Sequence, residues 1–186
     1  MRTLVRVGDI GLRRQRDLVQ HEIRSATFEH QYAGSIAQPR RKAALTNDHI
    51  AAFVFDAISD HLGEPADWSL SETLRTVVPP LERWRFAGVS PHFTVYRYER
   101  GDSFANHRDE ERQVGPTRWT ALSLLLYLPS EGDALVGGET FVDCEKVEPE
   151  PWSVVVFAHH TWHHSAEVIS GSKLVVRGDV TIEPVG

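Results

Sequence analysis

The sequence predicts a mainly β protein with N-terminal helices, in which a double-sheet jelly roll carries a helical layer on one of its sheets. Two observations support this fold class. Apolar residues in the first half recur at helical spacing, whereas from Gly88 onward short β-rich runs are divided by Gly, Pro and Asp. Because the helices come first and the strands follow, the pattern favours a sandwich or barrel over alternating β and α units.

Length and composition suit one globular domain. The 186 residues match the usual size of a single hydrophobic core, and 41% hydrophobic with 25% charged residues argues against disorder, collagen and coiled coil. We expect a single domain over residues 1–186, with a helical support region at 1–88 and the jelly-roll core at 89–182.

Charge, cysteine content and hydropathy limit the kinds of partner and the cellular compartment that we expect. The formal net charge of −6 argues against a nucleic-acid partner, whose phosphates require a basic surface. Cys144, the only cysteine, cannot form an intramolecular disulfide, the first 11 residues contain no apolar leader, and no apolar run could span a membrane. We therefore expect a cytoplasmic protein with no membrane partner, and the sequence gives no indication of its oligomeric state.

Five segments are predicted in the first half. Residues 1–7 alternate as a short strand, and residues 12–28 form a charged helix with one apolar face. Residues 31–42 follow neither period and are predicted to be a loop. Residues 47–62 form the best-defined helix, with Asn47 or Asp48 as N-cap and Gly63 after its end, and residues 68–78 contain another short helix.

The second half is predicted to consist of short strands. They cover residues 93–98, 104–109, 118–128, 139–142, 152–157, 163–168 and 173–182.

His107-Arg108-Asp109 is the only His-x-acid triplet in the chain. Residues two apart on a strand point to the same face, so this imidazole and this carboxylate can share a cation. A second His would complete the facial triad that leaves positions open on Fe(II). Four His residues qualify. His163 is favoured, His164 is the alternative, and His159 and His160 are interpreted as loop residues or as supports for a ligand.

Lys173, Val175 and Arg177 alternate on one face of the last predicted strand. A cation on that face would lie beside the open metal positions. A carboxylate cosubstrate would fit there.

Five motifs in register give a family resemblance. Residues 89–182 resemble the Fe(II)/2-oxoglutarate dioxygenases of the prolyl 4-hydroxylase-like branch, whereas residues 1–88 match no known motif. The motifs, in chain order, are Tyr98-x-x-Gly101-x-x-Phe104, His107-x-Asp109, the strand from Arg118 to Tyr127-Leu128, Gly137-Gly138-Glu139-Thr140-Phe141, and the set His163, Val168, Gly171 and Lys173. The resemblance implies the double-stranded β-helix fold of the cupin-like proteins.

The resemblance also implies site residues. His107, Asp109 and His163 would be the catalytic iron ligands, and Lys173 would pair with the distal carboxylate of 2-oxoglutarate by a charge-assisted bond. Arg177 is the alternative anchor. Tyr127 and Tyr98 are further candidates for contacts with the cosubstrate. The implied cofactors are Fe(II), 2-oxoglutarate and O2, with ascorbate as a stimulating reductant.

Two departures from the family pattern remove no ligand. Glu150-Pro151-Trp152-Ser153 stands where the family often has Gly, and Glu167 stands where it often has Pro. Asp109 is intact, which favours hydroxylation over the halogenation of relatives that lack this carboxylate.

The predicted activity is therefore oxidative. We expect a hydroxylase that inserts oxygen from O2 into an unactivated C–H bond of a free amino acid or other small metabolite and releases succinate and CO2. The alternative substrate is a prolyl or other residue in a peptide or protein. A long groove beside the iron would favour the peptide, and a closed pocket the metabolite, with residues 30–46 and 110–117 as the deciding segments.

Two other functional classes fit the sequence less well. A non-catalytic jelly-roll binding module would have no reason to carry the ligands, Lys173 and Tyr127 together. Another metal enzyme on a cupin-like barrel is disfavoured because its usual His-x-His pair is absent from the sequence.

Overall fold

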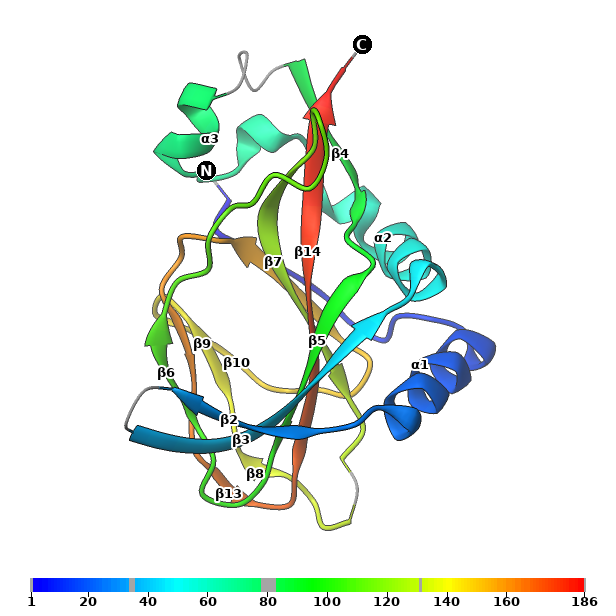
Figure 1. Cartoon of the computed structure of the whole chain (residues 1–186), viewed down its shortest axis with the longest axis vertical. Coiled ribbons are helices and arrows are strands. Elements are labelled where there is room, and N and C mark those ends of the chain that lie inside the picture. The colour runs from blue at the N-terminus through cyan, green and yellow to red at the C-terminus, as the bar shows by residue number, and fades with distance from the viewer. Residues whose placement is uncertain (1, 34–35, 78–82, 131, 186) are drawn as a thin grey trace.

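The computed structural model describes residues 2–33, 36–77, 83–130 and 132–185. Within them, two antiparallel sheets face each other and helices cover one side (Figure 1). No helix among these residues is long and apolar enough to cross a membrane. The predicted jelly roll with a helical layer is confirmed.

The major sheet has eight strands. Seven follow the order β1-β11-β7-β14-β5-β3-β2, and β4 also pairs with β14. Their bounds are β1 (Leu4–Val7), β2 (Glu29–Ala33), β3 (Ile36–Thr46), β4 (Trp84–Val89), β5 (His92–Tyr98), β7 (Trp119–Leu128), β11 (Val154–Ala158) and β14 (Lys173–Pro184).

The minor sheet has the order β10-β9-β12-β6, and a separate two-stranded ribbon pairs β13 with β8. The bounds are β6 (Phe104–His107), β8 (Val136–Gly137), β9 (Thr140–Val142), β10 (Glu145–Val147), β12 (His163–Ser165) and β13 (Val168–Ser170). The single strand predicted over residues 163–168 is thus divided between β12 and β13.

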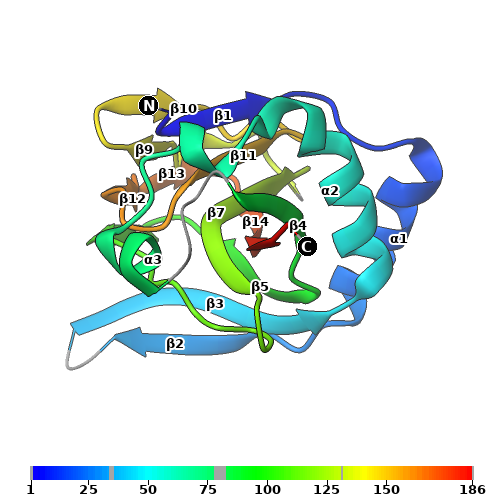
Figure 2. The ribbon, with the colours of Figure 1, turned by 90° about the horizontal axis from the view of Figure 1, so that it is seen from above.

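Three α-helices and one 3-10 turn complete the described elements: α1 (Arg13–Ser25), α2 (Asp48–Leu62), η1 (Pro65–Asp67) and α3 (Glu72–Val77). The view in Figure 2 shows α1 and α2 on one side of the major sheet. The predicted N-cap of α2 is confirmed, because the Asn47 side chain accepts a hydrogen bond from the backbone N–H of Ile50 at 3.0 Å. Gly63 follows the helix with φ +67°.

The prediction of a loop over residues 31–42 is wrong. This segment contributes to β2 and β3, and β3 continues to Thr46 in pairing with β5, where Arg41 lies opposite Arg97 and Thr46 opposite His92. Pairing between residues far apart in sequence decides this strand, and a local pattern with three consecutive cations gives no indication of it. The described part of residues 1–88 therefore supplies β1, β2, β3 and most of β4 as well as helices.

The alternation of side chains along β7 and β14 creates two cores. Leu124, Leu126 and Val176 point toward the helices and belong to the larger apolar cluster. Leu125 and Val175 point the other way and belong to a smaller cluster between the two sheets, with Tyr127, Val142, Val147, Val155 and Phe157. The inward-facing polar residues of the same two strands also enter the space between the sheets, which is where the candidate site lies.

Candidate active site

Three predicted metal ligands lie together between the sheets. One ligand atom each from His107, Asp109 and His163 lies within 4.8 Å of the others. His107 ends β6 and His163 begins β12, and these two residues are direct partners in the minor sheet. Asp109 follows β6, and its backbone N–H donates to the carbonyl of His159 at 2.9 Å. His164 is not in this cluster, and its ring stacks on Phe141 with centroids 4.7 Å apart.

Each imidazole in the cluster has one ring nitrogen directed to a backbone carbonyl. Nδ1 of His107 lies 2.9 Å from the carbonyl oxygen of Ala105, and Nδ1 of His163 lies 3.0 Å from that of Thr161. Since a carbonyl only accepts, Nδ1 carries the proton and Nε2 keeps its lone pair for a metal. Burial lowers the pKa of both rings, so both are neutral at physiological pH.

Asp109 is held as a carboxylate. Burial alone would raise its pKa, but the Arg177 guanidinium, 3.1 Å away, and a hydrogen bond from the Ser123 hydroxyl lower the pKa to about 2. Two neutral imidazoles and one carboxylate are the donor set that suits Fe(II) with open coordination positions. The described side chains therefore fit an iron ion.

A cavity of about 110 Å³ adjoins this cluster. Its lining includes Tyr96, Tyr98, Phe104, Thr140, Ser165, Lys173 and Arg177, together with all three members of the cluster. Phe104 stacks on the His107 ring with centroids 3.9 Å apart, and the Phe157 ring lies 4.6 Å from His163. Each imidazole ring thus packs against an aromatic side chain, which restricts its orientation.

Lys173 is the buried cation of this cavity, with 3% of its surface exposed. Its Nζ donates to the Gly138 carbonyl at 2.6 Å, to Ser165 Oγ at 2.8 Å and to Thr140 Oγ1 at 3.1 Å. Burial lowers the pKa of Lys173 to about 7. An ammonium in this setting gains strongly from a carboxylate, because no ionised acid is within hydrogen-bond distance of it among the described residues.

Thr140 connects Tyr127 to the cavity. Its hydroxyl oxygen accepts from Lys173 and also from the Tyr127 hydroxyl at 2.8 Å. A hydroxyl has two acceptor positions and one proton, so the proton of Thr140 is available to a group in the cavity. Tyr127 is not among the lining residues and lies behind Thr140, whereas Tyr98 lines the cavity, with its ring centroid 5.1 Å from Lys173 Nζ.

The two candidate anchors differ in their partners. Arg177 lies 3.1 Å from Asp109 and 2.8 Å from Asp179, so two carboxylates already balance its charge. Lys173 contacts only uncharged oxygens. This difference favours Lys173 as the residue that receives an external carboxylate, with Arg177 as a partner of the metal ligand.

Residues 93–178 match the model of the 2OG-Fe(II) oxygenase superfamily. This segment belongs to that superfamily. The predicted enzyme class and the predicted cofactors, Fe(II), 2-oxoglutarate and O2, are confirmed. No curated protein matches the sequence.

Solved structures share the fold of the oxygenase at low identity. A viral collagen prolyl hydroxylase from Paramecium Bursaria Chlorella virus-1 has a TM-score of 0.57 at 16% identity, covering 97% of this chain and 96% of that one. A prolyl-4-hydroxylase from Pseudomonas putida has 0.59 at 13%, covering 96% and 92%. A prolyl hydroxylase from Trichoplax adhaerens, in complex with a hypoxia inducible factor peptide fragment, has 0.59 at 12%, covering 96% and 83%.

Iron with 2-oxoglutarate supplies oxidative decarboxylation coupled to hydroxylation of a C–H bond by O2. Residues of the oxygenase would hold the metal and orient the cosubstrate for this reaction. His107, His163 and Asp109 would hold the metal, and Lys173 and Thr140 would orient the distal carboxylate of the cosubstrate. Tyr96, Tyr98 and Phe104 give this space a largely apolar wall.

A wider groove of about 570 Å³ adjoins the cavity, and both are lined by Tyr96, Asp109 and Arg177. One wall is formed by residues 44–46 of β3 and 92–94 of β5, and the other by Arg108, Glu110 and Arg112. The site is therefore open to solvent on the side of Asp109. The groove crosses β3, part of which was predicted from the sequence to be a loop.

Sequence reasoning missed several polar residues of the site. Ser123 and Asp179 are fully buried. Ser123 interrupts the apolar run of β7, and Asp179 lies two residues after Arg177 on the same face of β14; these were the available signals. Arg40 had no such signal. It is 2% exposed, and its guanidinium carbon lies 3.1 Å from the centroid of Phe104, a position that only the pairing of β3 with β5 could reveal.

Proposed function

We propose that the oxygenase hydroxylates a residue within an extended peptide or protein segment, with proline as the first residue to test. Iron would bind at His107, Asp109 and His163, and Lys173 would anchor 2-oxoglutarate. The observation that carries the choice of substrate is the open groove beside Asp109. A free metabolite, the first expectation from the sequence, would be better served by a closed pocket.

The dimensions of the two hollows support this division. The smaller cavity of about 110 Å³ beside Lys173 suits one small dicarboxylate. The groove is roughly five times larger and runs over the paired strands β3 and β5. Thr46 and His92 on these strands are exposed, and their side chains could bind the backbone of an extended chain.

The structural relatives support the same proposal by analogy. The three solved structures named above are described as prolyl hydroxylases, and one of them contains a peptide. Their identity to this chain is below one fifth, so they guide the choice of the first substrates and carry no further weight.

The first experiment tests the cofactor assignment. The protein is reconstituted anaerobically with Fe(II) and 2-oxoglutarate, and the weak visible charge-transfer band of the chelate is recorded for wild type, Lys173→Ala and Asp109→Ala. We expect the band in wild type and its loss or strong reduction in both variants. A wild type that binds iron but gives no band would refute the assignment of the cosubstrate site.

The second experiment tests the substrate. Succinate release and the mass gain of one oxygen atom are measured with a pool of prolyl peptides and with a pool of free amino acids. Ala44→Arg, which places a bulky charge in the groove, should raise KM for a peptide and leave the charge-transfer band intact. Ala66→Arg, the same change at an exposed position outside the groove, is the matched control. Turnover of free amino acids that Ala44→Arg does not affect would overturn the peptide proposal.

A further inference from the structure

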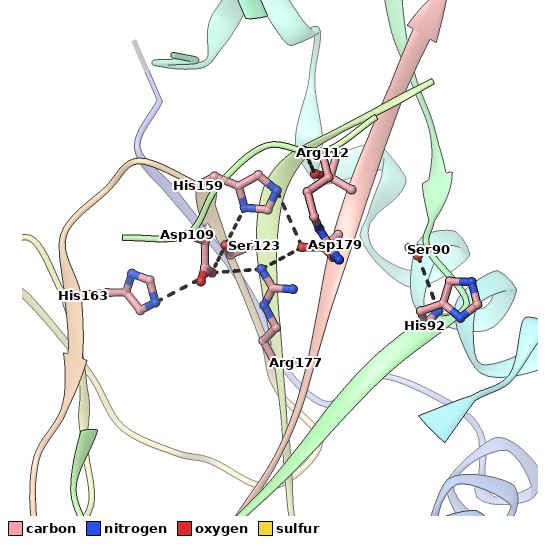
Figure 3. A network of polar contacts seen from close by, with 10 residues as sticks. Ser90, His92, Asp109, Arg112, Ser123, His159, His163, Arg177 and Asp179 are labelled. Carbon is pink, nitrogen blue, oxygen red and sulfur yellow. Dashed lines mark hydrogen bonds and ion pairs between the residues drawn. The ribbon is translucent and has the colours of Figure 1, made fainter. Parts of the chain in front are cut away.

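A line of buried polar side chains lies behind the candidate metal ligand Asp109 (Figure 3). Ser123 on β7 and Asp179 on β14 are direct cross-strand partners, and His159 follows β11, the neighbour of β7. All three have no exposed surface. Burying polar groups destabilises a fold unless they bond to one another, so their bonding pattern is informative.

The hydrogen-bond donors in this line have a fixed direction. Ser123 Oγ lies 2.5 Å from Asp109 Oδ2 and 2.7 Å from His159 Nδ1. Since an ionised carboxylate only accepts, the single proton of the Ser123 hydroxyl must go to Asp109. Nδ1 of His159 must therefore donate to Ser123 Oγ.

His159 also contacts Asp109 through the main chain. Its carbonyl oxygen accepts the backbone N–H of Asp109 at 2.9 Å. The ring and the carbonyl of one residue thus fix both the side chain and the backbone of the candidate ligand. Neither contact is with the metal position itself.

Arg177 makes a second contact with Asp109. Arg177 lies 3.1 Å from Asp109 and 2.8 Å from Asp179, whereas Nε2 of His159 lies 3.6 Å from Asp179 Oδ1 and makes no hydrogen bond to it. Arg112 holds the other oxygen of Asp179 at 2.7 Å. The Ser123 hydroxyl and Arg177 thus both hold the Asp109 carboxylate, which restricts its rotation more than a single bond would.

We propose that Ser123 and His159 are positioning residues for the metal: His159 directs the Ser123 hydroxyl, which orients the Asp109 carboxylate for binding. The inference rests on the proposed assignment of Asp109 as a metal ligand. Residues that orient a ligand in this way affect metal affinity by about 10- to 100-fold when removed. A merely structural role would lower stability and leave metal affinity unchanged.

The test measures the affinity of the metal-free protein for Co(II), followed by its visible absorption, together with thermal unfolding of the same samples. Ser123→Ala and His159→Leu each remove one donor, and we expect about 10- to 100-fold weaker Co(II) binding in both. His159→Asn and Ser123→Thr keep a donor at the required position and should bind Co(II) nearly as wild type does.

Thr181→Val is the matched control. It removes a buried hydroxyl from β14, the strand paired with β7, where Thr181 donates to the Gly88 carbonyl, away from Asp109. It should lower thermal stability without changing Co(II) affinity. If His159→Leu fails to fold, the pair Ser123→Ala and Ser123→Thr decides the question.

Two outcomes would overturn the proposal. Wild-type Co(II) affinity in Ser123→Ala would exclude the orienting bond, and equal losses in His159→Asn and His159→Leu would exclude the donor role of His159. Asp109→Ala separates this failure from failure of the proposed function. If Asp109→Ala binds Co(II) as wild type does, then Asp109 is not a ligand at all.

Discussion

The buried ammonium of Lys173 makes binding of 2-oxoglutarate dependent on pH. Burial lowers its pKa from 10.5 to about 7 in the protein without cosubstrate. Only the protonated form pairs with a carboxylate. As pH rises above about 7, the charged fraction therefore falls up to tenfold per pH unit, which corresponds to about 1.4 kcal/mol of binding free energy per unit.

The sign and the limit of this effect follow from linkage. A bound carboxylate favours the ammonium, so binding raises the pKa of Lys173. Affinity should be highest below about pH 7, fall through the next units, and level off above the pKa of the complex. His107 and His163 do not produce this slope. Their lowered pKa values leave both rings neutral above pH 7, and their deprotonation would favour the metal.

The assay is an anaerobic titration of the Fe(II) protein with 2-oxoglutarate, followed by the charge-transfer band, between about pH 6 and about pH 8.5 with saturating metal. Lys173→Met has similar bulk and no charge, and should bind 2-oxoglutarate weakly with no slope. An affinity in wild type that is constant across pH 7, or the same slope in Lys173→Met, would refute the reasoning.

Three further predictions concern stability. The pKa of Asp109 is lowered from 3.8 to about 2, which contributes about 2 kcal/mol to the free energy of unfolding above pH 4. This contribution is lost as pH falls toward 2. Urea unfolding of wild type should therefore be more acid-sensitive than that of Asp109→Asn. Phe157→Ala opens a hole between the sheets and should lower the free energy of unfolding by about 3–5 kcal/mol, together with Co(II) affinity, because Phe157 packs on His163. An unchanged melting temperature would contradict this. Asn47→Ala removes the N-cap of α2 and should cost about 1 kcal/mol in chemical denaturation, with no change in Co(II) binding.

Local patterns predicted the parts of the fold that depend on local chemistry. The cap at Asn47, the stop at Gly63 and the apolar strands β7, β11 and β14 follow from periodicity and from residue preferences. β2 and β3 could not be predicted in this way. Their polar sequence becomes a sheet only through pairing with β5, which lies about 50 residues further along the chain.

The candidate site could likewise be predicted only in part from local patterns. The spacing of His107 and Asp109 and the alternation of Lys173 and Arg177 were visible in the sequence, and the structure places these side chains around one cavity. The roles of Ser123 and His159 depend on contacts between β6, β7 and β11, which no spacing within one strand encodes. The groove likewise depends on β3, which the sequence did not predict, and it is the basis on which we propose a peptide in place of the metabolite first expected.

The candidate ligands are distributed unequally between the two sheets. His107 and His163 belong to the minor sheet, whose strands are three or four residues long, whereas Asp109 is bonded to Ser123 and Arg177 of the major sheet. A metal ion would therefore crosslink the two sheets. Short strands open by local fluctuation at lower free energy than a central strand such as β14. Without metal, amide hydrogen exchange should be fastest in β6, β9 and β12, and metal should slow exchange there far more than in β7 or β14.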